Sequence, residues 1–143
     1  MLKKIVIVIV AVAMCFLCGC SKDSQTLEKE LSNVKNVGDI QLNKLTVFKW
    51  DKVFFIAPYT SKEEIENAIS IKSEKIEDNN YDEDEVYMIF VDGNKIVYTI
   101  MGRTDNLGFC FELGNFDRVK ELSVEKSSFS VSDDGDILVY TLK

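Results

Sequence analysis

A dense apolar run, closed by the only proline of the chain, places the strongest constraint on the fold. The run is Val53-Phe54-Phe55-Ile56-Ala57, and Pro58 follows it directly. Half-exposed strands alternate apolar and polar residues, and this run does not alternate, so it predicts a strand buried on both faces. Because proline lacks the backbone N–H that a strand interior needs, Pro58 ends the strand. The fold therefore has to cover this strand on two sides.

A helix is predicted immediately after this proline. Thr60 and Ser61 are each followed three positions later by a glutamate, which gives two overlapping capping boxes. Ile65 and Ile69 then lie one helical turn apart and continue the pattern. Together these signals predict a helix from about residue 62 to residue 71.

The second half of the chain is rich in short strand signals. Two β-rich runs, 86–91 and 95–101, flank Asp92-Gly93-Asn94, whose residues tolerate the positive φ of a tight hairpin turn. Further strands are expected at 107–113, 128–132 and 137–142. Residues 115–124 fit a helical turn or a strand equally well. Short strands with one good helix predict an α+β fold: a single small domain, mainly an antiparallel sheet with that helix packed on one face.

The N-terminal residues have the parts of an export signal. Lys3 and Lys4 lie near the start of the chain, an apolar run of 15 residues extends from Ile5 to Gly19, and polar residues follow Cys20. A membrane-spanning helix needs about 20 apolar residues, so this run is short for an anchor. We expect a cleaved leader at 1–19, with an uncleaved anchor or a secretory peptide cut elsewhere as the alternatives.

The end of this leader, Leu17-Cys18-Gly19-Cys20, resembles the lipobox of bacterial lipoproteins. The resemblance implies cleavage before Cys20 and attachment of a diacylglyceryl group to its sulfur. It also implies that the protein is anchored by lipid on the extracytoplasmic face of the cell membrane. Two acyl chains hold a protein stably at a bilayer, whereas one chain binds only marginally.

The polar segment after the leader predicts a spacer. We expect a lipidated N-terminus and polar tether at 20–39, with a short helix between Thr26 and Asn36, and an α+β domain at 40–143. Cleavage of the leader leaves 15 basic and 24 acidic residues, a net charge of about −9. Such a body is repelled by nucleic acid and by anionic headgroups, so we expect no nucleic-acid partner and membrane contact through the lipid.

Trp50 and Tyr59 flank the predicted buried strand and form a candidate interaction patch. In the favoured alternative, Trp50 covers the core and Tyr59 packs over the helix start. The stretch from Trp50-Asp51-Lys52 through Pro58-Tyr59-Thr60 to the acidic helix start resembles a group of small uncharacterised lipoproteins of Gram-positive bacteria. The resemblance covers about a third of the mature chain, supports a domain start near Ile40, and implies no activity.

The residue types of the chain exclude several kinds of chemistry. The chain has no histidine, which excludes nucleophile–imidazole catalysis and histidine-ligated metals. Cys110 is the only thiol left after leader cleavage, and we expect a packed side chain rather than a reactive one. The acidic loop at 74–85 alternates acids like the start of a calcium-binding EF-hand loop. However, Glu83 replaces the required glycine and Ile89 the final glutamate, so a solvated loop is favoured and no metal or cofactor is expected.

These observations predict a membrane-anchored binding module that is not an enzyme and that contacts an envelope protein or another surface component. One alternative is an inhibitor or immunity-type module, which would neutralise a basic partner through its acidic surface. The other is a hydrolase of envelope glycans that uses carboxylates alone. Such a hydrolase needs two acids on strand ends that face one cleft, one of them poorly solvated.

Overall fold

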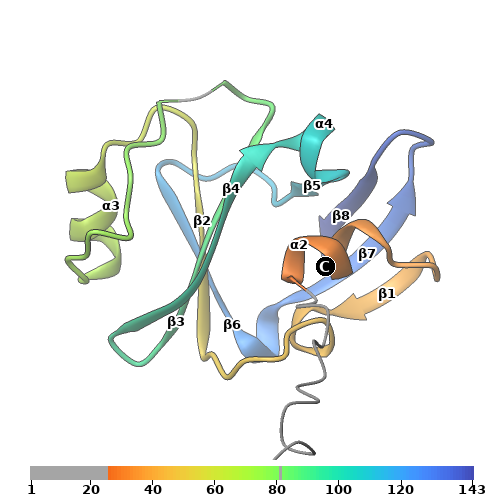
Figure 1. Ribbon diagram of the computed structural model, residues 1–143, viewed down its shortest axis with the longest axis horizontal. Helices are drawn as coiled ribbons and strands as arrows, with labels where there is room; N and C mark the ends of the chain where they lie inside the picture. The colour runs from red at the N-terminus through yellow and green to blue at the C-terminus, as the bar shows by residue number, and fades with distance from the viewer. Residues whose placement is uncertain (1–25, 81) are drawn as a thin grey trace, which may run out of the picture.

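The structure is a computed structural model that describes residues 26–80 and 82–143. The predicted leader and Cys20 lie outside the described residues. In chain order the elements are α2 (Leu27–Ser32), β1 (Gly38–Gln41), η2 (Leu42–Lys44), β2 (Lys52–Ile56), α3 (Lys62–Ile69), β3 (Glu85–Asp92), β4 (Lys95–Arg103), α4 (Thr104–Leu107), β5 (Phe109–Glu112), β6 (Val119–Ser123), η3 (Val124–Lys126), β7 (Ser128–Asp133) and β8 (Leu138–Leu142). The fold is α+β, with two four-stranded sheets and a few short helices (Figure 1).

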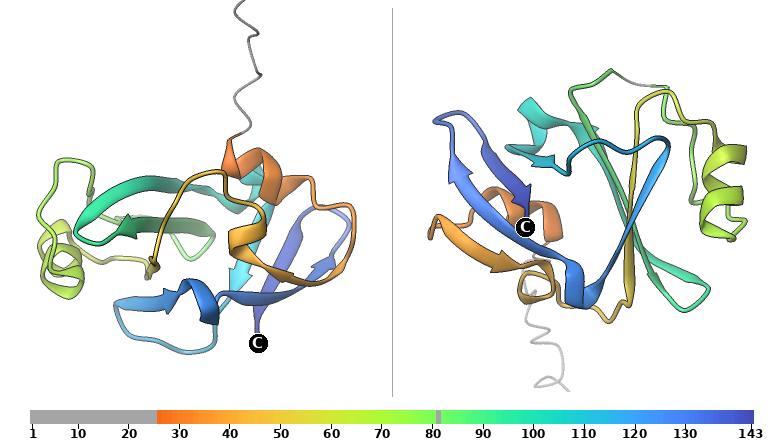
Figure 2. Two further views of the ribbon diagram at one scale, coloured as in Figure 1. Left: turned by 90° about the horizontal axis from the view of Figure 1, so that it is seen from below. Right: turned by 180° about the vertical axis from the view of Figure 1, so that it is seen from behind.

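The first sheet, here called the central sheet, has the strand order β4-β3-β2-β6 and is antiparallel throughout. The predicted buried strand is β2, and Val53 to Ile56 are each at most 5% exposed. Phe54 and Ile56 pack against α3, while Val53 and Phe55 face the core between the two sheets. Figure 2 shows α3 on the far side of the central sheet from the second sheet. The prediction of a strand covered on both faces is confirmed.

The predicted helix and hairpin are both present. In α3, the Ser61 side chain accepts from the Glu64 N–H and the Glu64 carboxylate accepts from the Ser61 N–H, which completes one of the two capping boxes. Strands β3 and β4 pair from Glu85↔Arg103 to Asp92↔Lys95. Gly93 in the turn has φ 62°, the positive value that a tight hairpin requires.

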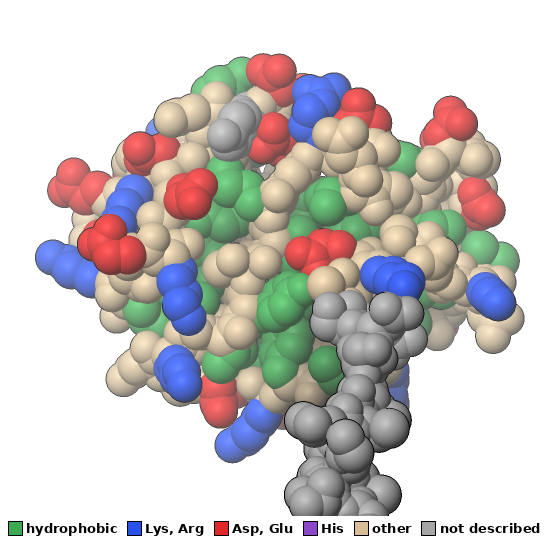
Figure 3. All heavy atoms as spheres, viewed as in Figure 1, with side chains coloured by type: hydrophobic (Ala, Val, Ile, Leu, Met, Phe, Trp, Pro, Cys, Tyr) green, Lys and Arg blue, Asp and Glu red, His purple; other side chains and the backbone are tan. Residues whose placement is uncertain are grey.

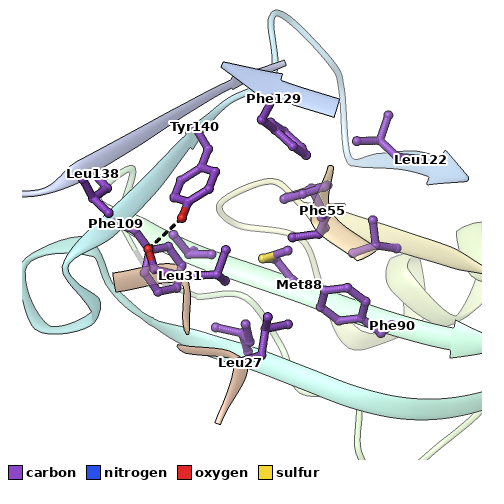
Figure 4. Packing of buried hydrophobic residues seen from close by; sticks show 14 of the residues in the cluster. Leu27, Leu31, Phe55, Met88, Phe90, Phe109, Leu122, Phe129, Leu138 and Tyr140 are labelled. Carbon is purple, nitrogen blue, oxygen red and sulfur yellow. Dashed lines mark hydrogen bonds between the residues drawn. The ribbon is translucent and has the colours of Figure 1, made fainter. Parts of the chain in front are cut away.

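The second sheet, here called the terminal sheet, has the order β1-β7-β8-β5. Its β5 and β8 run parallel, in contrast to the other pairs. The predicted strands at 128–132 and 137–142 are β7 and β8. The sequence predicts one sheet, and the structure divides the strands into two, with an aromatic core between them. Figure 4 shows side chains of both sheets in this core, among them Phe55, Phe109, Phe129 and Tyr140.

One strand prediction changes at its boundaries, and the structure resolves one ambiguous segment. Residues 104–107 form α4, so the strand expected at 107–113 begins only at Phe109. Gly108 ends α4 with φ 79°, a conformation that favours glycine and turns the chain into β5. Leu107 is therefore the last helical residue. The ambiguous segment at 115–124 contains a strand, β6, followed by the 3-10 turn η3.

Packed structure begins at Leu27, before the domain start predicted at residue 40, and the short helix expected between Thr26 and Asn36 is α2. Leu27 and Leu31 are 3% and 0% exposed and belong to the core between the sheets. The Tyr140 hydroxyl donates to the Leu31 carbonyl at 2.7 Å (Figure 4). The Tyr98 hydroxyl donates to the Glu28 carboxylate at 2.6 Å. β1 then pairs with β7, so the tether predicted at 20–39 is folded from residue 27 onward.

The helices of the described residues are too short or too polar to cross a bilayer. The longest of them, α3, has eight residues.

Candidate ligand-binding cleft

A cleft of about 420 Å³ opens between one end of the central sheet and the edge strand β5. It is formed by the end of β2, the start of β3, and β5 with the loop that follows. The lining residues are Phe55, Ile56, Ala57, Pro58, Glu83, Glu85, Val86, Tyr87, Thr104, Cys110, Phe111, Glu112, Leu113, Gly114, Asn115 and Phe116. Segments far apart in the sequence therefore share one concave surface.

Hydrogen bonds from Asn79 fix the part of the cleft that β2 contributes. Its side-chain amide donates to the carbonyls of Ile56 and Ala57 at 3.3 and 2.9 Å, and its backbone N–H donates to the Thr60 carbonyl at 2.8 Å. Asn79 is only 2% exposed. These bonds satisfy carbonyl groups at the point where Pro58 ends the strand, which holds the chain in place beside the cleft.

Aromatic packing fixes the apolar floor of the cleft, to which β5 contributes Phe111. The Phe111 ring lies 5.0 Å from the rings of Phe55 and Tyr140 and 5.3 Å from that of Phe129, measured between centroids. Lys120 donates from Nζ to the Leu113 carbonyl at 2.8 Å and holds the loop after β5. An apolar floor of this kind is preformed, since its side chains are held by neighbours on both sheets.

The rim of the cleft is acidic. Glu83, Glu85 and Glu112 line it, and among the described residues no lysine or arginine does. Burial raises the pKa of Glu85, repulsion from Asp82 adds to the effect, and attraction to Arg103 opposes it. Figure 3 shows several acidic side chains at the top of the molecule, where β2 ends and β3 begins. The cleft therefore combines an apolar floor with a negative rim.

Cys110 lines the same cleft and is partly exposed. Burial raises the pKa of its thiol, and the negative charges of Glu112 and Asp134 raise it further. A thiol of raised pKa is protonated at neutral pH, and the thiolate is the nucleophilic form. These surroundings disfavour a catalytic cysteine.

The structure separates the two residues of the predicted interaction patch. Trp50 is 6% exposed, donates from Nε1 to the Thr46 hydroxyl at 2.9 Å and packs edge-on against Phe90. Tyr59 lies beyond the other end of β2 and is 63% exposed. Trp50 therefore covers the core, as the favoured alternative predicts, and shares no exposed patch with Tyr59. Tyr59 remains as an exposed ring next to the cleft residue Pro58, and its backbone has φ 60°.

The acidic loop at 74–85 contributes to the fold through several of its side chains. The Asp78 carboxylate accepts from the Lys62 N–H at 2.6 Å, at the start of α3. The Tyr59 hydroxyl donates to the Asp82 carboxylate at 3.5 Å. Within residues 26–80 and 82–143, no three acidic or cysteine side chains come close enough together to hold a metal ion.

Sequence reasoning did not single out Glu85, Glu112 or Asn79. The first two are ordinary acids at a strand start and a strand end, and only the packing of β3 beside β5 brings them to one cleft. Asn79 lies in a polar loop, where a buried amide has no local signal.

Comparison with known protein families, with curated proteins and with solved structures finds no match to this chain.

Proposed function

We propose that the protein is a lipoprotein anchored through Cys20 on the extracytoplasmic face of the membrane. In this proposal its cleft binds a cationic, partly apolar segment of an envelope partner and catalyses no reaction. The observation that carries the binding proposal is the cleft itself, with Glu83, Glu85 and Glu112 around aromatic side chains. The lipobox-like sequence at residues 17–20 supports the anchor.

The negative charge of the cleft rim favours a positively charged ligand. Three carboxylates around a partly enclosed space attract a cation, and the low dielectric of the apolar floor strengthens that attraction. The raised pKa of Glu85 reflects a carboxylate that lacks full solvation, and a bound cation would relieve this deficit. A lysine or arginine side chain suits such a site, because its apolar stem contacts the floor while its charged end meets the rim.

The chain offers little for covalent catalysis. It has no histidine, and burial raises the pKa of the Cys110 thiol in the cleft. Both features favour recognition over reaction at this surface.

Peptide titration tests the ligand class. The full chain would be titrated with Lys-Phe-Lys and Glu-Phe-Glu tripeptides while amide chemical shifts are recorded by NMR. We expect Lys-Phe-Lys to shift cleft residues such as Val86 and Glu112, and the binding to weaken as salt shortens the Debye length from about 30 Å to about 3 Å. Equal binding of both peptides, or binding that is independent of salt, would contradict the proposal.

Charge-matched variants locate the binding. The double variant Glu83→Gln/Glu112→Gln removes two rim charges, and Glu63→Gln/Glu125→Gln removes two exposed charges that do not line the cleft. We expect the first to weaken Lys-Phe-Lys binding by about tenfold and the second to leave it nearly unchanged, since interactions at close range exceed screened ones. Equal losses in both variants would assign the effect to net charge instead of the cleft.

Mass spectrometry of protein from native membranes tests the anchor separately. We expect an N-terminal peptide that begins at Cys20 and carries a diacylglyceryl group. A peptide that begins at Met1, or an unmodified Cys20 sulfur, would contradict the anchor and leave the cleft proposal standing.

The second candidate function is a hydrolase that uses carboxylates alone. The observation that favours it is that Glu85 and Glu112, at two strand ends, line one cleft and that burial raises the pKa of Glu85. A general acid of a glycosidase needs such a raised pKa. Release of reducing sugar from envelope glycan by the wild type, abolished in Glu85→Gln, would favour this candidate; absence of release would remove it.

A further inference from the structure

A strained residue follows the proline that ends β2, in the connection to α3 (Figure 1). Tyr59 has φ 60°, in the left-handed region that glycine enters freely and other residues, apart from asparagine and aspartate, rarely adopt. Pro58 before a residue of positive φ is the pattern of a type II turn, whose second central position favours glycine or asparagine. A tyrosine at this position therefore costs free energy that a glycine or an asparagine would spare.

The backbone of this turn is fixed without the tyrosine ring. The buried Thr60 donates from Oγ1 to the Ala57 carbonyl at 2.7 Å, and the Asn79 N–H donates to the Thr60 carbonyl at 2.8 Å. Arg118 donates from Nη1 to the Tyr59 carbonyl at 3.3 Å, and the Ala57 N–H donates to the Arg118 carbonyl at 2.9 Å. These bonds join the turn to the loop before β3 and to the residue before β6. The surrounding structure thus imposes the positive φ, and the ring does not.

The ring lies beside the acidic rim of the cleft. Tyr59 is 63% exposed, and its hydroxyl donates to the Asp82 carboxylate at 3.5 Å. Pro58 and Glu83, which are the chain neighbours of these two residues, both line the cleft. An exposed aromatic ring beside a negative rim can offer its face to a ligand in the cleft.

The basic side chains near this turn are paired with acids. Nε of Arg118 lies 3.6 Å from the Glu64 carboxylate and 3.9 Å from that of Asp117. Lys62, which begins α3, has its Nζ 3.9 Å from the Glu66 carboxylate. Neither base therefore makes the surface around the ring positive, and the carboxylate in contact with the ring hydroxyl keeps it negative.

We propose that the face of the Tyr59 ring binds a second cationic group of the partner segment, next to the acidic rim of the cleft. The proposal rests on the proposed function, which gives the cleft a cationic, partly apolar ligand. An ammonium or guanidinium group over a tyrosine ring is attracted by the negative charge of the π face. Residues that break a local rule at a cost in free energy are typical of functional sites, and here the cost keeps an aromatic ring exposed beside the cleft. The partner segment then carries two basic residues, one for the carboxylates and one for the ring.

Four forms of the full chain test this contact: the wild type, Tyr59→Phe, Tyr59→Leu and Tyr59→Asn. Each is titrated with Lys-Phe-Lys, and NMR records the cleft amides. We expect Tyr59→Phe to bind like the wild type, because it keeps an aromatic face, and Tyr59→Leu and Tyr59→Asn to bind about fivefold more weakly. Equal affinity in all four forms would overturn the proposal. It would also be overturned if Tyr59→Leu bound as tightly as the wild type, because the contact would then be apolar and not with a π face.

Urea unfolding without the peptide separates recognition from a structural role of the ring. Because asparagine adopts a positive φ more readily than tyrosine, we expect the urea midpoint of Tyr59→Asn to equal or exceed that of the wild type. A lower midpoint would show that the ring stabilises the fold, and the functional explanation of the strain would be wrong.

The ring protons of Tyr59 in the wild type distinguish this proposal from the proposed function. If Lys-Phe-Lys shifts the cleft amides and leaves the ring protons unchanged, the cleft binds the peptide and the role of Tyr59 is overturned. If the ring protons shift and the cleft amides do not, the cation contact of Tyr59 is supported and the cleft proposal fails. If neither set shifts, both proposals are overturned.

Discussion

Two short helices of this molecule, α2 and α3, are held in place in different ways. The longer, α3, has a complete capping box at its start and places Ile65 and Ile69 on the central sheet. The shorter, α2, has six residues and a long capping contact, 3.4 Å from the Lys29 N–H to the Thr26 hydroxyl. Yet Leu31 of α2 is as fully buried as Ile65 of α3, at 0% exposed.

The difference shows that a helix with weak capping signals in its sequence can be buried as deeply as a well-capped one. An isolated helix of six residues is unstable in water, so α2 depends on its tertiary contacts. Those contacts come from Tyr98 and Tyr140, which lie 70 and 109 residues away in the sequence from Glu28 and Leu31. A segment that reads as a polar tether is therefore part of the core.

The largest expected effects come from truncating one buried side chain in each helix, Leu31 in α2 and Ile65 in α3. Leu31→Ala and Ile65→Ala each remove a fully buried side chain and leave a cavity, so we expect each to lower the free energy of unfolding by about 2 to 5 kcal/mol. Urea denaturation followed by circular dichroism measures both. If Leu31→Ala lowers the free energy of unfolding far less than Ile65→Ala does, α2 is a tether and not part of the core.

Tyr140→Phe removes a hydroxyl that joins the terminal sheet to α2. The Leu31 carbonyl loses its 2.7 Å donor inside the core, and we expect a loss of about 1 to 3 kcal/mol. Val139→Ala, at a half-buried position on the same strand, is the control for general damage to β8. An unchanged urea midpoint in Tyr140→Phe would contradict the attachment of α2 by this bond.

High pH provides a third test of the α2 contacts. Burial, and then the hydrogen bond to Glu28, raise the pKa of Tyr98 to about 12, above its ordinary value of about 10. Between these values the unfolded chain loses the proton while the folded chain keeps it, so stability is complete below pH 10 and falls as the pH rises toward 12. We expect the free energy of unfolding of Tyr98→Phe to fall less steeply with pH, with a slope smaller by an amount that corresponds to at most about one proton. The same slope in both proteins would contradict the contact.

The smallest expected effects concern the two N-caps. Ser61→Ala removes a capping box, and we expect a loss of about 1 kcal/mol. Thr26→Ala removes only a long, exposed contact, so we expect about 0.5 kcal/mol or less. Thermal or urea unfolding of both variants measures the ratio. A larger effect at Thr26 would reverse the distinction between a locally encoded helix and one held by the core.

Much of the fold could be predicted, because its signals are local. The buried strand at 53–57, the capped helix after Pro58 and the hairpin around Gly93 each depend on residues within about ten positions. The strand expected at 107–113 was displaced because Gly108 ends a short helix first. The candidate site was not predicted, since Asn79, Glu85 and Glu112 acquire their roles only through contacts between distant segments.

By itself, the sequence determined the strands β2, β3, β4, β7 and β8, the main helix, the excess of acid and the absence of histidine chemistry, because these follow from residue types and short spacings. Only the tertiary structure decided that the strands form two sheets and that α2 belongs to the core. It also brought Glu83, Glu85 and Glu112 to one cleft. The physical reason is that burial and electrostatic interaction depend on distance in space, and a composition or a net charge averages over that distance.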